Sequence, residues 1–277
     1  MSGAMRINRA LDRARVLARV AAPDNLVWQD DHLLFSSGQD VLVIDGVRAA
    51  AAVPEPILRF DTVVTALAGA LDGSLAVGLG AAGIRIVGGA RDGLRITTLG
   101  GRPVVCPTAL CFAAPDVLFV CHGSGGQSPF DGGSVWRLGL AGGEAVCLGA
   151  GLAGPNGLLL LDRARRIAVS EGTRRRLVAL DVTRPAALEV LCDDLPGEPG
   201  RLAPAGGGGA WLAMSDRREA ALAVLLDGAF RPAVALRGRW QGVTSCLDVQ
   251  GDLLLACRDS GALIASDMSR RVRRMRP

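Results

Sequence analysis

A short pattern recurs six times along this chain at nearly constant spacing. Each copy has Pro or Val, two variable residues and then an apolar residue that opens a short apolar run, as in Pro23-Asp24-Asn25-Leu26. The copies begin at Pro23, Val64, Pro107, Pro155, Pro199 and Val243. Their second residues are 41, 43, 48, 44 and 44 positions apart. A fixed period of this length is typical of a repeat architecture in which each unit contributes several strands.

Every unit divides into four short apolar runs separated by Gly, Asp and Pro. In the fourth unit the expected strands are 156–161, 166–170, 176–182 and 187–192. In the second unit they are 64–70, 74–79, 83–87 and 94–99, with Asp72-Gly73 as a hairpin turn. The sequence therefore predicts an all-β, six-bladed β-propeller with four antiparallel strands per blade. A β-sandwich would fit the strands but not the period.

The propeller is expected to close through its N-terminal strand. Residues 15–20 precede Pro23 as a fourth strand precedes the next unit elsewhere, so they should pair with the sixth unit beside 263–267. A competing strand at 271–275 is the alternative. The chain 1–277 would then form a single β-propeller domain, with 1–14 and 269–277 as tails.

Composition limits the classes of partner. Hydrophobic residues make up 49% of the chain, which is enough for a large core, and a net charge of +4 is too small to indicate nucleic-acid binding. No apolar run approaches the length of a membrane span. Seven cysteines without a CxxC pair indicate reduced, mostly buried thiols and a cytoplasmic protein. The absence of Lys and Tyr suggests a bacterial gene of high GC content.

The repeat also predicts where a site lies, because the innermost strands of a propeller begin on one face beside the central channel. The second residues of the six copies should form a polar ring there: Asp24, Thr65, Thr108, Asn156, Gly200 and Thr244. Asn25 and Arg201 follow two of them. Ordinary turn chemistry is the alternative explanation for the polar ring.

Loops between the second and third strands should wall this site. Five are short, 258–261 among them, whereas the third runs from 122 to 133. Long loops on a rigid scaffold are often functional. We expect this one to act as a lid with Phe130 as its apolar contact and His122 at its start as a proton-transfer group. A solvated loop histidine is the alternative, and His32 should lie on the opposite face.

Several stretches carry a family resemblance. They are PDNLVW at 23–28, GSVWRLGL at 133–140, GPNGLLL at 154–160, LPGEPGRLAPAGGGGAWLAMS at 195–215 and VTSCLDVQGDLLLACRDSGALIASD at 243–267. In order and register they resemble the SMP-30/gluconolactonase/strictosidine synthase-like superfamily of six-bladed propellers, over about 15–267.

The resemblance implies a metal site, but this chain differs from the family at several of its ligand positions. Lactonases of the superfamily hold a divalent cation, usually calcium, with ligands whose positions here carry Asp24, Thr108, Asn156 and Gly200. Only Asp24 and Asn156 remain as metal ligands, and the general-base Asp falls in the Gly200 region. Because calcium prefers six to eight oxygens, no cofactor is expected, with Ca²⁺ or another divalent cation as the alternative. The strictosidine synthase branch implies a glutamate where this chain has Thr244.

Three functions are compatible with the sequence. The resemblance favours a hydrolase of a lactone or ester-type small molecule with a degenerate metal site. The alternatives are a metal-free lyase or condensing enzyme that uses Asp24 and His122, and a non-catalytic propeller that binds a small molecule or a protein. The expected partner is a small-molecule ligand in the channel, without nucleic acid or membrane. Its expected binding residues are Asn25, Thr65, Thr108, Phe130, Asn156 and Thr244.

Arg201 carries a further hypothesis about the site. It lies beside the lost carboxylate position, so its guanidinium could replace the metal as the positive group, pair with Asp24 and bind an anionic or carbonyl ligand. The alternative is an arginine that points into solvent.

Overall fold

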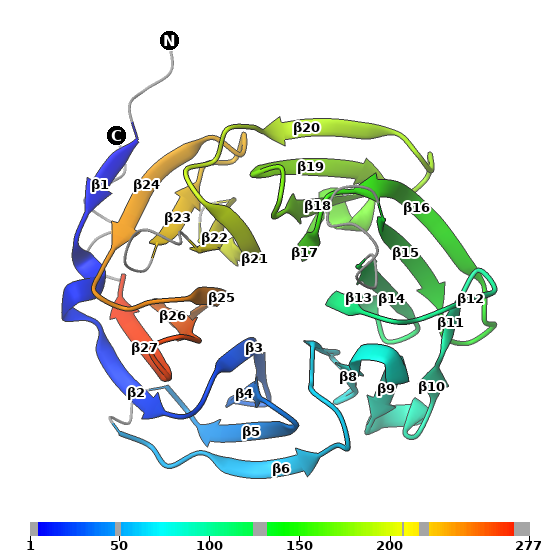
Figure 1. The fold of residues 1–277 in the computed structure, drawn as a ribbon, viewed down its shortest axis with the longest axis horizontal. Helices are drawn as coiled ribbons and strands as arrows, with labels where there is room; N and C mark the ends of the chain where they lie inside the picture. The colour runs from blue at the N-terminus through cyan, green and yellow to red at the C-terminus, as the bar shows by residue number, and fades with distance from the viewer. Residues whose placement is uncertain (1–4, 48–50, 124–131, 207, 216–221, 269–277) are drawn as a thin grey trace.

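Six antiparallel sheets stand around a common axis, as Figure 1 shows, and confirm the predicted six-bladed propeller. The computed structural model describes residues 5–47, 51–123, 132–206, 208–215 and 222–268. Within these ranges the helical segments are short 3₁₀ turns at Ala10–Arg13, Gly80–Ala82, Gly89–Arg91 and Asp162–Ala164. No helix in the described residues is long and apolar enough to cross a membrane.

The blades follow one another along the chain, each from its inner to its outer strand. Blade 1 has β3 (Pro23–Gln29), β4 (His32–Ser37), β5 (Asp40–Asp45) and β6 (Glu55–Arg59). Blade 2 has β7 (Ala66–Gly69), β8 (Leu75–Gly78), β9 (Ile84–Val87) and β10 (Arg95–Ile96). Blade 3 has β13 (Pro107–Ala114), β14 (Val117–His122), β15 (Gly133–Gly139) and β16 (Ala145–Leu152).

The second half of the ring repeats this order. Blade 4 has β17 (Pro155–Leu161), β18 (Arg166–Glu171), β19 (Arg176–Asp181) and β20 (Leu188–Cys192). Blade 5 has β21 (Glu198–Ala205), β22 (Gly209–Ser215), β23 (Leu222–Leu226) and β24 (Pro232–Arg237). Blade 6 has β25 (Val243–Val249), β26 (Asp252–Cys257), β27 (Ala262–Asp267) and β2 (Arg15–Arg19).

The strand limits in blade 4 lie within one residue of the predicted ones, but the outer strand of blade 2 differs. The segment expected as one strand at 94–99 divides into β10 and β11 (Thr98–Leu99), and β11 pairs with β12 (Arg102–Pro103) in a separate hairpin. Gly100 and Gly101 both have positive φ angles, which turn the chain back on itself at this point. The two glycines therefore end the fourth strand of blade 2 early.

The ring closes as predicted, because β2 pairs antiparallel with β27. The prediction that residues 1–14 form a tail was partly wrong. β1 (Arg6–Asn8) adds a parallel fifth strand to blade 5 beside β24. The indole of Trp240 fixes the next turn by donating from Nε1 to the Leu11 carbonyl at 2.9 Å. The expected tail 269–277 and the competing strand 271–275 lie outside the described residues.

Apolar side chains fill the spaces between neighbouring blades. In the middle strands both faces are buried, as in β22, where Trp211 is 1% exposed. Such strands are almost continuously apolar because each face packs against a neighbouring blade. All seven cysteines are free, as expected, but only Cys121, Cys246 and Cys257 are buried and the other four are half-buried. The resulting rigid ring holds the inner strand starts in fixed positions.

Candidate functional site

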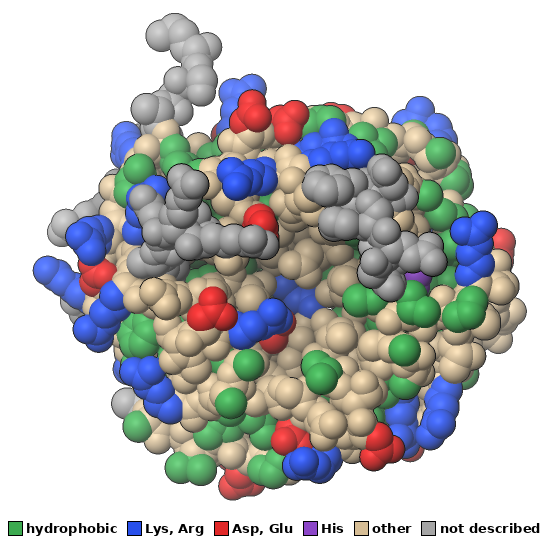
Figure 2. Space-filling view, in the orientation of Figure 1, with side chains coloured by type: hydrophobic (Ala, Val, Ile, Leu, Met, Phe, Trp, Pro, Cys, Tyr) green, Lys and Arg blue, Asp and Glu red, His purple; other side chains and the backbone are tan. Residues whose placement is uncertain are grey.

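The site face is the one on which the inner strands begin, and Figure 2 shows it hollowed at its middle with basic and acidic side chains in the hollow. Asp24 and Asn25 lie at the start of β3 and are almost fully buried. Asn25 has a φ of +54°, a left-handed conformation that asparagine tolerates better than most residues. Its side-chain amide donates to Ser36 Oγ at 2.7 Å. The backbone bend and this hydrogen bond together fix the direction of the Asn25 side chain.

Arg201, on β21, reaches across the axis to the opposite side of the ring. Its Nη2 donates to Asn25 Oδ1, to the Thr65 carbonyl at 3.1 Å and to the Thr108 carbonyl at 2.9 Å. These acceptors belong to the entrances of blades 1, 2 and 3, while Arg201 belongs to blade 5. The guanidinium therefore lies in the channel, as the hypothesis that Arg201 replaces the metal requires, and not in bulk solvent.

The expected direct pair of Arg201 with Asp24 is replaced by a longer chain of contacts. Arg258, which follows β26, donates from Nη2 to Asp24 Oδ2. Asp24 Oδ1 accepts from the backbone N–H of Asn25 at 2.8 Å. The order is thus Arg258, Asp24, Asn25, Arg201. The sequence analysis placed 258–261 in a loop that walls the site, but it missed Arg258 as the partner of Asp24. The only signal for this role was the position of Arg258 directly after the second strand of blade 6.

Burial and the neighbouring charges set the protonation states here. Burial lowers the pKa of Arg201 and the Asp24 charge opposes this shift, but an arginine stays protonated at neutral pH. Burial also raises the pKa of the Cys121 thiol, and that of Cys111 to about 12. These thiols are therefore neutral and poor nucleophiles near pH 7.

The threonines of the predicted ring join neighbouring blades. Thr65 Oγ1 donates to the Pro107 carbonyl at 2.6 Å, and Thr108 Oγ1 donates to the Pro155 carbonyl at 2.5 Å. Thr244 Oγ1 is buried and has no hydrogen-bond partner within the described ranges. Asn156, by contrast, is exposed at the start of β17. Thr65 and Thr108 thus have a structural role, and their role in ligand binding stays a prediction.

No contact among the described residues brings His122 to this centre. His122 Nε2 accepts from the backbone N–H of Val105 at 3.2 Å, so the neutral ring carries its proton on Nδ1. Burial lowers the pKa of His122, which favours this neutral form. Phe130 and most of the predicted lid, residues 124–131, lie outside the described residues.

The residues present do not fit a divalent cation. Asp24 is already engaged by Arg258, and the guanidinium of Arg201 brings positive charge to the middle of the ring. A calcium ion needs six to eight oxygens, with affinity that rises with the number of carboxylates. Within the described residues no three His, Cys, Asp or Glu side chains gather as a metal site would require.

Solved structures with the same architecture include a gluconolactonase from Xanthomonas campestris, with a TM-score of 0.73 and 17% identity over 96% of this chain and 98% of that one. The chain has the fold of the SMP-30/gluconolactonase propellers. Regucalcin from Agrobacterium tumefaciens, a calcium-binding protein, gives a TM-score of 0.72 and 12% identity over 96% of each chain.

A chain from a nidogen/laminin complex is also similar, with a TM-score of 0.68 and 15% identity over 86% of this chain and 89% of that one. No family model and no curated protein matches the sequence. The likeness is therefore one of fold, shared by proteins with different names and activities.

Proposed function

We propose that this chain is a lactonase-like hydrolase that binds a small lactone or ester at the channel mouth, with Arg201 in the place of a metal cation. The observation that carries this proposal is the way Arg201 is held. All of its hydrogen bonds to described residues use Nη2, so Nε–H and the Nη1 hydrogens have no partner among those residues. A fixed guanidinium with free donors can polarise a carbonyl and stabilise the oxyanion that forms from it.

The reaction needs only residues of this site and water. Water oxygen bonds to the carbonyl carbon polarised by Arg201, and Asp24 takes the proton that the water loses. The ester C–O bond then breaks, and the leaving alkoxide takes the proton back from Asp24. The product of a lactone is a hydroxy acid. Asp24 suits this role because its charge acts on Arg201 and its carboxylate is held at the same mouth.

The name of one structural neighbour supports the choice of reaction class, and the description of another names calcium, the cation whose place Arg201 would take. One is a gluconolactonase, and another is a regucalcin described as calcium-binding. The substitution of a guanidinium for the cation keeps a positive group at the centre while removing the need for metal ligands. We therefore assign the hydrolase to a metal-independent mechanism.

A second candidate function is a propeller that binds its ligand without chemistry. The Arg258 ion pair favours it, because both carboxylate oxygens of Asp24 already accept hydrogen bonds and are less available to a water molecule. The lyase alternative has less support, since His122 contacts Val105 rather than Asp24.

A hydrolysis screen with glucono-δ-lactone, γ-butyrolactone and p-nitrophenyl acetate tests the proposal. Activity should persist in EDTA and should fall about 100-fold in Arg201→Gln, the scale of losing an oxyanion donor. Arg166→Gln is the matched control, because Arg166 is an ion-paired arginine at the end of blade 4 that lies away from the site. Hydrolysis that requires added calcium would contradict the proposal. Ligand-induced stabilisation without turnover would favour the binding function.

A further inference from the structure

The channel mouth holds two guanidinium groups and one carboxylate in a single chain of contacts. Arg258 binds Asp24, Asp24 binds the backbone of Asn25, and the Asn25 amide oxygen binds Arg201. The groups joined in this way carry a net charge of +1. Because burial makes unbalanced charge costly, a ligand with one negative charge would complete this cluster better than a neutral one.

The two arginines differ in freedom. Arg201 is anchored to three blade entrances, whereas the side chain of Arg258 is 49% exposed and makes its described contact only with Asp24. The Asp24 side chain is 12% exposed and remains within the mouth. A half-exposed rim arginine can exchange one carboxylate for another, since a planar guanidinium binds any carboxylate through the same paired N–H donors.

We propose that the mouth is a carboxylate site formed by Arg201 and Arg258, in which Asp24 is an internal carboxylate that competes with the ligand. The ligand class is a small monoanionic carboxylic acid. This inference rests on the channel site of the proposed function but not on hydrolysis. If hydrolysis occurs, the hydroxy-acid product belongs to the same class and inhibits the enzyme.

Competition by Asp24 gives an unusual expectation for its removal. Asp24→Asn keeps the shape of the side chain but removes the negative charge beside both arginines. The substitution should abolish hydrolysis if Asp24 is the base, yet it should increase the affinity for carboxylates. If Asp24 had only a structural role, the substitution would weaken both hydrolysis and carboxylate binding.

Isothermal titration calorimetry of the full-length protein with gluconate and lactate, and with lactamide as the neutral control, tests this inference. Wild type should bind the acids and not the amide. Asp24→Asn should bind them about tenfold more tightly, the scale of one charge-assisted contact. Arg258→Gln, at a half-exposed rim position, should bind them about tenfold more weakly, and Arg166→Gln should match wild type.

Equal binding of lactate and lactamide would overturn the carboxylate site, whatever the hydrolysis screen shows. Unchanged or weaker carboxylate binding by folded Asp24→Asn would overturn the role of Asp24. Should Asp24→Asn fail to fold, unchanged binding by Arg258→Gln overturns the site by itself. Carboxylate binding without lactone hydrolysis would instead leave this inference standing and remove the proposed reaction.

Discussion

Two glycines beside Arg201, Gly157 and Gly200, lie at positions where a side chain would clash with a neighbouring strand. The absence of their side chains allows the strand that carries Arg201 to lie close to the axis. A Cβ on Gly157 would lie 2.4 Å from the Gly200 carbonyl oxygen and 3.1 Å from Arg201 Cα. A Cβ on Gly200 would lie 2.8 Å from the Thr244 carbonyl oxygen. The small residues therefore permit the close approach of the innermost strands of blades 4, 5 and 6. The site depends on these contacts as much as on its charged groups.

Gly157→Ala tests this close approach. The added methyl group must displace β21, so we expect a loss of about 1–3 kcal/mol of unfolding free energy, as for other overpacked cores, together with loss of ligand binding. Denaturant unfolding measures the first and calorimetry the second. Gly142→Ala is the matched control, because a Cβ there meets no atom within 4 Å. Equal stability of the two variants would contradict this account.

Glu171 shows how a buried charge can be structural. Its side chain is fully buried, and its carboxylate accepts from the Ala153 backbone N–H at 2.7 Å and from Arg174 and Arg176. Glu171→Gln should lower the unfolding free energy by about 3 kcal/mol, because Arg176 loses its buried counter-charge. Glu189→Gln, in an exposed pair with Arg166, should cost less than about 1 kcal/mol. Chemical denaturation compares them, and similar losses would show that burial is not the cause.

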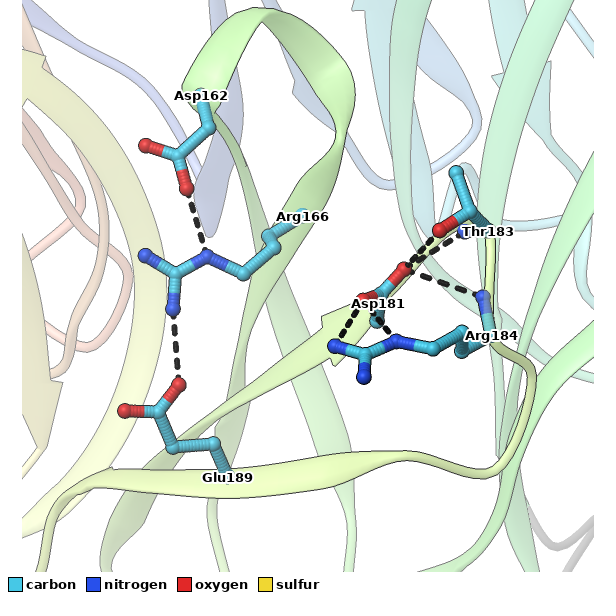
Figure 3. Close-up of polar contacts among 6 residues, drawn as sticks. All are labelled: Asp162, Arg166, Asp181, Thr183, Arg184 and Glu189. Carbon is cyan, nitrogen blue, oxygen red and sulfur yellow. Dashed lines mark hydrogen bonds and ion pairs between the residues drawn. The ribbon is translucent and has the colours of Figure 1, made fainter.

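At the scale of the elements, turn chemistry fixes where strands end. Figure 3 shows Asp181 at the end of β19, where it accepts from Thr183 and Arg184. In the same blade Arg166 joins Asp162 to Glu189. The Asp181 contacts hold the connection between β19 and β20, and Arg166 ties the turn between β17 and β18 to β20, at the side of the blade away from the site.

Asp181 gives a pH prediction. Hydrogen bonds from Thr183 and Arg184 lower the pKa of Asp181 below its ordinary value of 3.8. A lowered folded-state pKa means that the stabilisation is complete above pH 3.8 and disappears as the pH falls through the folded-state value. Asp181→Asn should therefore have a lower Tm than wild type at pH 7, with a difference that narrows only below pH 3.8. Thermal unfolding across pH measures this. Asp116→Asn, at an exposed turn, is the control for the loss of one carboxylate, and a pH-independent deficit in Asp181→Asn would contradict the prediction.

The sequence was sufficient for the elements but only partly for the site. Periodic apolar runs and turn residues predicted blade 4 almost to the residue, because strand patterning is local. The ring of strand starts, from Asp24 to Thr244, followed from the same register. The pairing of Asp24 with Arg258 did not, because it joins residues 234 positions apart and depends on how far each side chain reaches. The strand at Arg6–Asn8 was missed because a three-residue parallel strand has too little pattern to recognise.

At the scale of the whole molecule, the N-terminal segment holds the ring together. β2 completes blade 6, and β1 adds to blade 5, so these two strands join the start of the chain to the two blades that come last in it. The guanidinium groups of Arg19 and Arg239 each lie over the Trp240 ring, at 5.4 and 5.2 Å from its centroid. Contacts of this kind make unfolding of the ring cooperative.

Removal of residues 1–20 should therefore destabilise the entire propeller. The outer edge of blade 6 would lose its fourth strand, and the apolar space behind β27 would open to solvent. We expect loss of the cooperative thermal transition, followed by circular dichroism. The full-length chain, measured in parallel, is the control. A truncated chain that still unfolds in one sharp transition would show that the closing strand is dispensable.

We propose that the Arg201 guanidinium occupies the place of a cation in this propeller. The most direct measurement is a calorimetric titration of EDTA-treated, full-length protein with calcium, beside Arg201→Gln. We predict no saturable calcium binding by the wild type up to millimolar concentration, because Arg201 repels the ion and Arg258 holds Asp24. One tightly bound calcium per chain, lost in Asp24→Asn, would contradict the account.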